Sequence, residues 1–241
     1  MNTSFHPTPR TLMGPGPSDV HPRVLGAMGK ATIGHLDPEF QALMEEIKDL
    51  MRYTFRTSNA LTLPLSAPGS AAMEASYANL LEPGDKAIVC INGVFGMRMA
   101  ENVRRMSGEL VTVEDEWGTQ VDPEKLRAAL IANPDAKVVG FVHAETSTGV
   151  CSDVKTLCAL AKEHGCLSIV DSVTGLAGVE LEVDQWQADG VGLCFRAPLT
   201  SDIEVHISHW LWADNLYLLG ADGAQAQAML AQVTAATSAA V

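Results

Sequence analysis

Short apolar segments alternate with amphipathic helices over most of this 241-residue chain. A strand that is apolar along its whole length is buried on both faces, as in a parallel sheet with helices on both sides. From hydrophobic periodicity and turn residues we predict strands over residues 61–65, 86–91, 110–113, 138–142, 166–170 and 191–195. We predict helices over residues 38–52, 71–81, 97–107, 122–132 and 152–164. The pattern indicates an α/β fold with a mostly parallel sheet.

Composition narrows the class of protein. Hydrophobic residues make up 47% and charged residues 19%, an ordinary globular mixture, and the net charge of −13 argues against nucleic acid or a membrane surface as partner. The five cysteines form no Cys-x-x-Cys pair, so we expect reduced thiols and no metal site. The N-terminus lacks a signal-peptide pattern, and no apolar run reaches the ~20 residues of a membrane span. We therefore expect a cytoplasmic protein.

Ligands of parallel sheets bind at the carboxyl ends of the strands, so the residues after Leu65, Ile91, Val142 and Val170 are the first candidates. Small residues around Gly69 and Ser70 precede a helix whose N-terminus would attract a phosphate. The alternative is an ordinary helix with Ser70 as its N-cap.

The other strand ends carry an aromatic ring, hydroxyl groups and a carboxylate. Phe95 lies in a glycine-flanked turn and could stack on a flat cofactor, or could be plain core. The run from His143 to Gly149 is rich in hydroxyls that could bind a ligand oxygen or satisfy the turn itself. Asp171 ends an apolar strand and needs a cationic or hydrogen-bonding partner, such as a protonated pyridine nitrogen. A helix-capping role for Asp171 is the alternative.

In sequence order, these motifs resemble the class V pyridoxal phosphate aminotransferases, in particular those that act on alanine or serine with glyoxylate or pyruvate. The resemblance covers about residues 10–192. The motifs are Gly-Pro-Gly-Pro-Ser at 14–18, Thr-Ile-Gly-His at 32–35, Pro-Gly-Ser at 68–70, Asn-Gly-x-x-Gly at 92–96, Glu-Thr-Ser-Thr-Gly at 145–149 and Asp-Ser-Val at 171–173. It implies a fold-type I large domain with a smaller C-terminal domain, which works as a homodimer with shared sites.

The resemblance also implies roles for individual residues. Gly69 and Ser70 would bind the cofactor phosphate, and Phe95 would stack on the pyridine ring. Asp171 would pair with the ring nitrogen and keep it protonated, so that the ring acts as an electron sink. The remaining expected contacts are Thr146 to the ring hydroxyl, Val173 on the opposite ring face, and Gly16, whose loop would lie near the substrate.

The family's Schiff-base lysine has no counterpart in this sequence. No lysine follows Lys162, and the expected position falls near Ala197. Arg196 cannot replace it, because a guanidinium group stays protonated and is not a nucleophile. A faint second similarity places His206 where the family's substrate-binding arginine would be. We therefore expect an N-terminal arm over residues 1–25, a large domain over 26–195 and a divergent tail over 196–241, with the small domain missing or fragmentary.

Two functional hypotheses remain open. The first is transamination by descent, with weak or no activity in this chain, and the sequence after residue 192 would then reflect a deletion or a reading-frame change. The second is a non-catalytic remnant, or a subunit that binds the cofactor non-covalently or pairs with a full-length relative. A dinucleotide-binding dehydrogenase is disfavoured, because Gly14-Pro15-Gly16 precedes the first credible strand and opens no helix.

Overall fold

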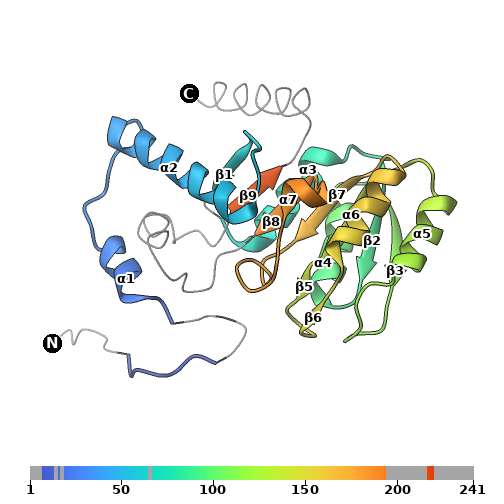
Figure 1. Cartoon of the computed structure of the whole chain (residues 1–241), viewed down its shortest axis with the longest axis horizontal. Coiled ribbons are helices and arrows are strands. Elements are labelled where there is room, and N and C mark those ends of the chain that lie inside the picture. The colour runs from blue at the N-terminus through green and yellow to red at the C-terminus, as the bar shows by residue number, and fades with distance from the viewer. Residues whose placement is uncertain (1–6, 14–15, 17–18, 65–66, 194–215, 220–241) are drawn as a thin grey trace.

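The computed structural model describes residues 7–13, 16, 19–64, 67–193 and 216–219 (Figure 1). The strands of its main sheet are β1 (Thr62–Pro64), β2 (Lys86–Ile91), β3 (Glu109–Glu114), β4 (Ala136–Val142), β7 (Leu167–Asp171), β8 (Gly190–Leu193) and β9 (Leu216–Leu219). A separate hairpin pairs β5 (Ala144–Glu145) with β6 (Val150–Cys151).

The sheet has seven strands in the order β1-β9-β8-β7-β4-β2-β3. β3, β2, β4, β7 and β8 run parallel to one another, whereas β9 is antiparallel to both β8 and β1. The prediction of an α/β fold with a mostly parallel sheet is confirmed. All six predicted strands are present, and β9 was not predicted.

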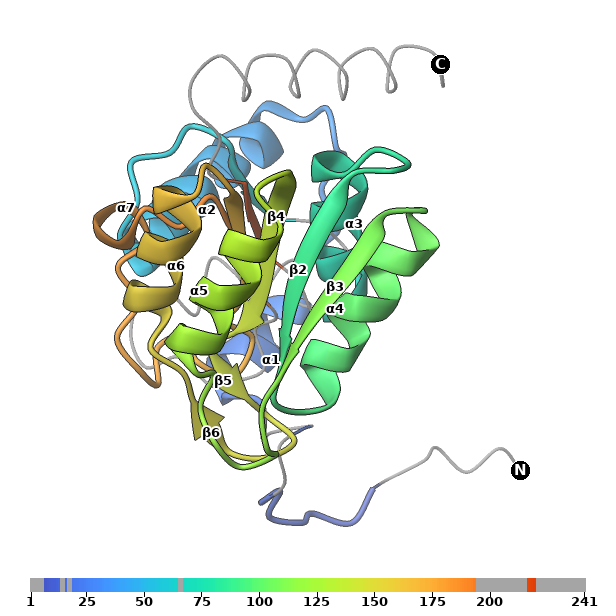
Figure 2. The ribbon, with the colours of Figure 1, turned by 90° about the vertical axis from the view of Figure 1, so that its right-hand side faces the viewer.

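Seven helices lie in the described residues: α1 (Pro22–Met28), α2 (Pro38–Phe55), α3 (Gly69–Leu80), α4 (Val94–Arg105), α5 (Pro123–Ala132), α6 (Val154–Glu163) and α7 (Val183–Trp186). α3 and α4 cover one face of the sheet, and α5 and α6 cover the other (Figure 2). Successive residues of β2 point to the two sides in turn: Ile88 and Cys90 pack with α5 and α6, while Val89 and Ile91 pack with α3 and α4. Burial on both faces explains why the sequence of β2 is apolar throughout.

Helix limits differ from the prediction where tertiary contacts decide them. α2 continues to Phe55, because this ring is fully buried in the same cluster as Ile47 and Met51, and the left-handed Arg56 (φ 54°) ends the helix. α3 begins at Gly69 and α4 at Val94, earlier than the predicted 71 and 97. None of the helices in the described ranges has both the length and the apolar content required to cross a membrane.

Close packing between α3 and β4 depends on a glycine. Tyr77 of α3 is fully buried, and a Cβ atom at Gly140 of β4 would overlap its hydroxyl group. This hydroxyl has no hydrogen-bond partner among the described residues. The tyrosine therefore gains from burial of its ring while its polar atom contributes nothing favourable.

Gly140→Ala is expected to lower the free energy of unfolding by about 1–3 kcal/mol, because the added methyl group displaces Tyr77 or β4. Urea unfolding followed by circular dichroism measures the change. Tyr77→Phe alone should be neutral or slightly stabilising, and Tyr77→Phe with Gly140→Ala should recover part of the loss. An unchanged stability of the single Gly140→Ala variant would contradict this account of the packing.

Candidate active site

A small cavity lies between the N-terminal part of α3, the middle of α4 and the carboxyl end of β7. It brings together three predicted residues from two motifs about a hundred residues apart: Gly69 from Pro-Gly-Ser, and Asp171 and Val173 from Asp-Ser-Val. The full lining is Gly69, Ala72, Met73, Ser76, Met99, Ile169, Val170, Asp171 and Val173. We call this space the Asp171 cavity.

The N-terminus of α3 faces this cavity without a side-chain cap. Its N-cap residue is Pro68, no side chain of the described residues accepts a hydrogen bond from the first turn, and that turn contains no acidic residue. The alternative role of Ser70 as N-cap is wrong, because Ser70 lies inside the helix. Unsatisfied N–H groups and the helix dipole give such an end a partial positive charge that favours an anion.

Asp171 is the buried acid of the cavity. It is the last residue of β7, its side chain is 6% exposed, and its Oδ1 accepts a hydrogen bond from the Val173 N–H at 3.0 Å. Burial raises the pKa of Asp171 to about 6, and the charge of Glu145 adds to the rise, while the Val173 N–H and Arg98 oppose it. A protonated base bound beside Asp171 would relieve this desolvation by pairing with the carboxylate.

Phe95 is held by a buried carboxylate that the sequence analysis did not single out. Glu145 is 1% exposed, and its Oε2 accepts hydrogen bonds from the N–H groups of Phe95 (3.1 Å) and Gly96 (3.4 Å). Ser147 completes the cap: its Oγ accepts from the Val94 N–H at 3.0 Å and donates to Glu145 Oε1 at 2.7 Å. The first turn of α4 is thus satisfied from a loop about fifty residues away in the chain.

This cap explains the glycine-flanked turn before α4. A Cβ atom at Gly93 would overlap the side chains of Glu145 and Ser147. Ser147, predicted as one of several possible ligand donors, is therefore used by the protein itself. Thr146 likewise forms a hydrogen bond with Thr174 through the two hydroxyl groups, and it does not line the Asp171 cavity.

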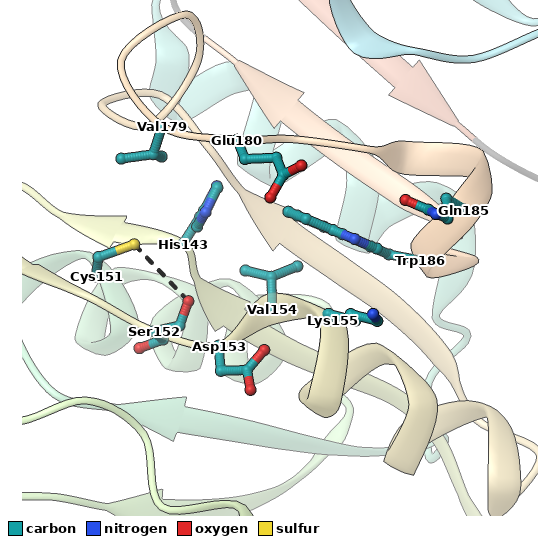
Figure 3. Close-up of a pocket in the computed structure, with 10 residues that line it drawn as sticks. All are labelled: His143, Cys151, Ser152, Asp153, Val154, Lys155, Val179, Glu180, Gln185 and Trp186. Atoms are coloured by element: carbon teal, nitrogen blue, oxygen red, sulfur yellow. Dashed lines mark hydrogen bonds between the residues drawn. The ribbon is translucent and has the colours of Figure 1, made fainter.

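His143 faces a different, larger space. Its Nδ1 lies 3.0 Å from Ser172 Oγ, its ring meets Trp186 edge-on at 6.1 Å, and burial lowers its pKa. The second cavity is about 490 Å³ and is lined by His143, Cys151, Ser152, Asp153, Val154, Lys155, Val179, Glu180, Gln185 and Trp186 (Figure 3). His143 thus lines this second cavity and not the Asp171 cavity, although its backbone N–H donates to the Asp171 carbonyl oxygen at 2.8 Å.

Neither of the two residues predicted to bind the substrate, Gly16 and His206, is found at the Asp171 cavity among the described residues. Gly16 has a φ of 141°, a conformation that favours glycine, and it lines neither cavity. His206 lies outside the described residues, as do Arg196 and Ala197.

Arg98 is a second residue that sequence reasoning missed. Its Nη1 donates to Ser70 Oγ at 2.8 Å, and its Cζ lies 4.8 Å from the centroid of the Phe95 ring. The available signal was its spacing, because residues three apart in a helix share a face and Arg98 follows Phe95 by three.

These groups match the chemistry of a phosphorylated pyridine. An uncapped helix N-terminus suits the phosphate, a buried carboxyl group suits a protonated ring nitrogen, and a half-buried aromatic ring lies nearby. The fold and the site together define a fold-type I large domain of the pyridoxal phosphate-dependent transferases.

Comparison with known proteins specifies the family. The family model described as aminotransferase class-V matches residues 14–192, and the chain belongs to this family. It is 36% identical over 193 residues to the (S)-ureidoglycine–glyoxylate transaminase of Bacillus subtilis and 39% identical over 180 residues to the alanine–glyoxylate aminotransferase of Mus musculus. These alignments cover 78% and 75% of the chain but only 46% and 43% of the relatives.

Solved structures agree with the sequence relatives. The alanine–glyoxylate aminotransferase of Nostoc sp. superposes with a TM-score of 0.82 at 37% identity, over 92% of this chain and 56% of that one. The ureidoglycine–glyoxylate aminotransferase of Bacillus subtilis gives 0.85 at 30% identity, over 95% and 56%. The chain therefore spans about half the length of the relatives it matches. Class V aminotransferases depend on pyridoxal phosphate.

Asp171→Asn should remove one component of the pH dependence of stability. Because the folded pKa of Asp171 is raised to about 6, its contribution to stability is present below pH 4 and is lost as the pH rises through 6. The loss amounts to roughly 3 kcal/mol for a shift of about two pH units. Urea unfolding at pH 4.5 and pH 7 measures the effect. Between the two pH values, the free energy of unfolding of Asp171→Asn should rise relative to that of the unchanged protein. Parallel pH profiles of the two proteins would contradict the burial argument.

Proposed function

We propose that this chain binds pyridoxal phosphate non-covalently in the Asp171 cavity. The proposal is carried by one observation: Gly69 of the Pro-Gly-Ser motif lines the same space as Asp171 and Val173 of the Asp-Ser-Val motif. The α3 N-terminus supplies the positive end for the phosphate, and Asp171 supplies the acid for the ring nitrogen.

Each remaining group has a separate task. Gly69 leaves the backbone N–H groups open to the phosphate, and Ser70 offers a hydroxyl. Phe95 packs on one face of the ring and Val173 on the other, while Thr146 binds the ring hydroxyl after exchanging its contact with Thr174. The Asp171 carboxylate accepts a hydrogen bond from the protonated ring nitrogen, and its negative charge keeps that nitrogen protonated. The bound cofactor supplies an electron sink for bonds at the substrate α-carbon.

The placement of the lysines supports non-covalent binding. All seven lie in the described residues, and none lines the Asp171 cavity; they are Lys30, Lys48, Lys86, Lys125, Lys137, Lys155 and Lys162. Lys86 pairs with Asp135 at 2.8 Å and Lys137 with Asp85 at 2.6 Å, both at the amino ends of their strands and so at the opposite edge of the sheet. A side chain at that edge cannot reach a ligand at the carboxyl ends.

The reaction class follows from the relatives. Two glyoxylate aminotransferase types are among the similar proteins, so the ancestral activity we propose is transfer of an amino group from alanine or serine to glyoxylate or pyruvate. Without a lysine to move the proton at the substrate α-carbon, this chain itself is weakly active or inactive.

Equilibrium dialysis with pyridoxal phosphate tests the binding. The unchanged chain should bind the cofactor, Asp171→Ala should weaken binding at least tenfold because the ring nitrogen loses its partner, and Glu116→Ala, on the exposed surface, should bind as the unchanged chain does. After borohydride reduction and peptide mapping, no lysine peptide should carry the cofactor. A labelled lysine would overturn the non-covalent claim, and equal binding by Asp171→Ala would remove Asp171 from the site.

A second function is favoured by the same absence of a nearby lysine: a subunit that pairs with a full-length class V relative and shares its site. Proteins of this family are commonly dimeric, and we propose a dimer here as well. Co-expression with a tagged full-length relative should yield a mixed dimer by affinity purification and analytical ultracentrifugation. A chain that sediments as a monomer both alone and with the relative would exclude this function.

A further inference from the structure

Arg98 contacts the first turns of both α3 and α4 at the edge of the site. Its Nη1 donates a hydrogen bond to Ser70 Oγ in the first turn of α3, at 2.8 Å. Its guanidinium carbon also lies 4.8 Å from the centroid of the Phe95 ring, in the first turn of α4. One cation therefore contacts two residues that we assign to cofactor binding, although it belongs to none of the motifs from which the site was predicted.

This cation has no acidic partner among the described residues. Arg104 and Arg105, on the same helix, both pair with Glu101, whereas no carboxylate of the described part lies within 4.0 Å of the Arg98 guanidinium. A guanidinium group has five N–H donors, and its contact with Ser70 uses one of them. The side chain is exposed, so the other donors are accessible to a ligand.

The charge of the expected ligand exceeds what the helix alone can balance. A phosphate monoester carries about −1.5 to −2 charges at neutral pH, whereas a helix N-terminus contributes about half a positive charge. Two buried carboxyl groups, Asp171 and Glu145, add negative potential nearby. A full positive charge at this edge would therefore strengthen the binding of the phosphate.

We propose that Arg98, which lies beside the Asp171 cavity and not in its lining, is a phosphate-binding residue that donates from its guanidinium group to the anion held at the N-terminus of α3. The identity of the anion rests on the proposed function. Arg98 also orients Ser70: because Ser70 Oγ accepts from Arg98, its own O–H is left to donate to the phosphate. Both side chains would thus donate hydrogen bonds to oxygens of the same phosphate group.

The test compares two probes that differ only in the phosphate. Pyridoxal phosphate and pyridoxal are bound by equilibrium dialysis to the full chain, to Arg98→Gln, to Arg98→Lys and to the control Arg105→Gln, which has the same net charge as Arg98→Gln. Arg98→Gln should weaken the binding of pyridoxal phosphate roughly tenfold or more, because a charge-assisted contact to phosphate is lost. The same variant should leave the binding of pyridoxal unchanged. Arg98→Lys should be intermediate, and Arg105→Gln should bind as the unchanged chain does.

The outcomes separate this inference from the proposed function. If the unchanged chain binds no pyridoxal phosphate, the proposed function fails. If it binds and Arg98→Gln binds equally well, or loses both probes equally, the inference about Arg98 fails. A measurement on the unchanged chain avoids any folding defect: saturating pyridoxal phosphate should protect Arg98 from modification by phenylglyoxal, with Arg105 as the unprotected reference in the peptide map. Modification of Arg98 at the same rate with and without the cofactor would also overturn it.

Discussion

The buried carboxyl group of Asp171 is the charge that most strongly determines which ligand the site can bind. It ends a strand that is apolar on both faces, so its carboxylate is removed from water with one backbone N–H as a hydrogen-bond donor. Burial raises its pKa to about 6, so the charged form that prevails at neutral pH is less stable here than it would be in water. A cationic ligand at this point stabilises the charged form, and binding free energy is gained because the protein alone leaves that charge poorly solvated.

The two helix N-termini beside Asp171 are treated differently by the fold. α4 is closed by Glu145 and Ser147, which together accept hydrogen bonds from the N–H groups of its first three residues. α3 has Pro68 as its N-cap, and no side chain of the described residues accepts a hydrogen bond from its first turn. Glu145 and Ser147 therefore neutralise the N-terminus of the helix that carries Phe95, whereas the N-terminus of α3 has no such partner among the described residues.

The strands and the class of fold could be predicted because burial on both faces leaves uninterrupted apolar runs in the sequence. The rule that ligands bind at strand ends pointed to Gly69 and Asp171, and the family resemblance added Val173; the three do line one cavity, although β1 and β7 are not neighbours in the sheet. Glu145 and Arg98 could not be assigned in the same way. Glu145 caps a helix about fifty residues earlier, and Arg98 meets a serine 28 residues away in the chain, so neither contact leaves a local pattern. The start of α4 was misplaced for the same reason, because local propensity does not register a cap from another loop.

No lysine lines the Asp171 cavity, so a cofactor bound there would not be held by a covalent bond to a lysine of this lining. Binding must then come from the phosphate, the ring nitrogen and ring packing, each a non-covalent contact whose strength depends on pre-placed partners. Arg98 and Ser70 are already hydrogen-bonded to each other, so little freedom of these two side chains is lost on binding, and Glu145 fixes the backbone at Phe95. In the proposed function, the contacts to the phosphate and the ring come from different residues than the lysine that would move the proton. The proposal therefore separates cofactor binding from catalysis, because the loss of the lysine leaves those contacts in place.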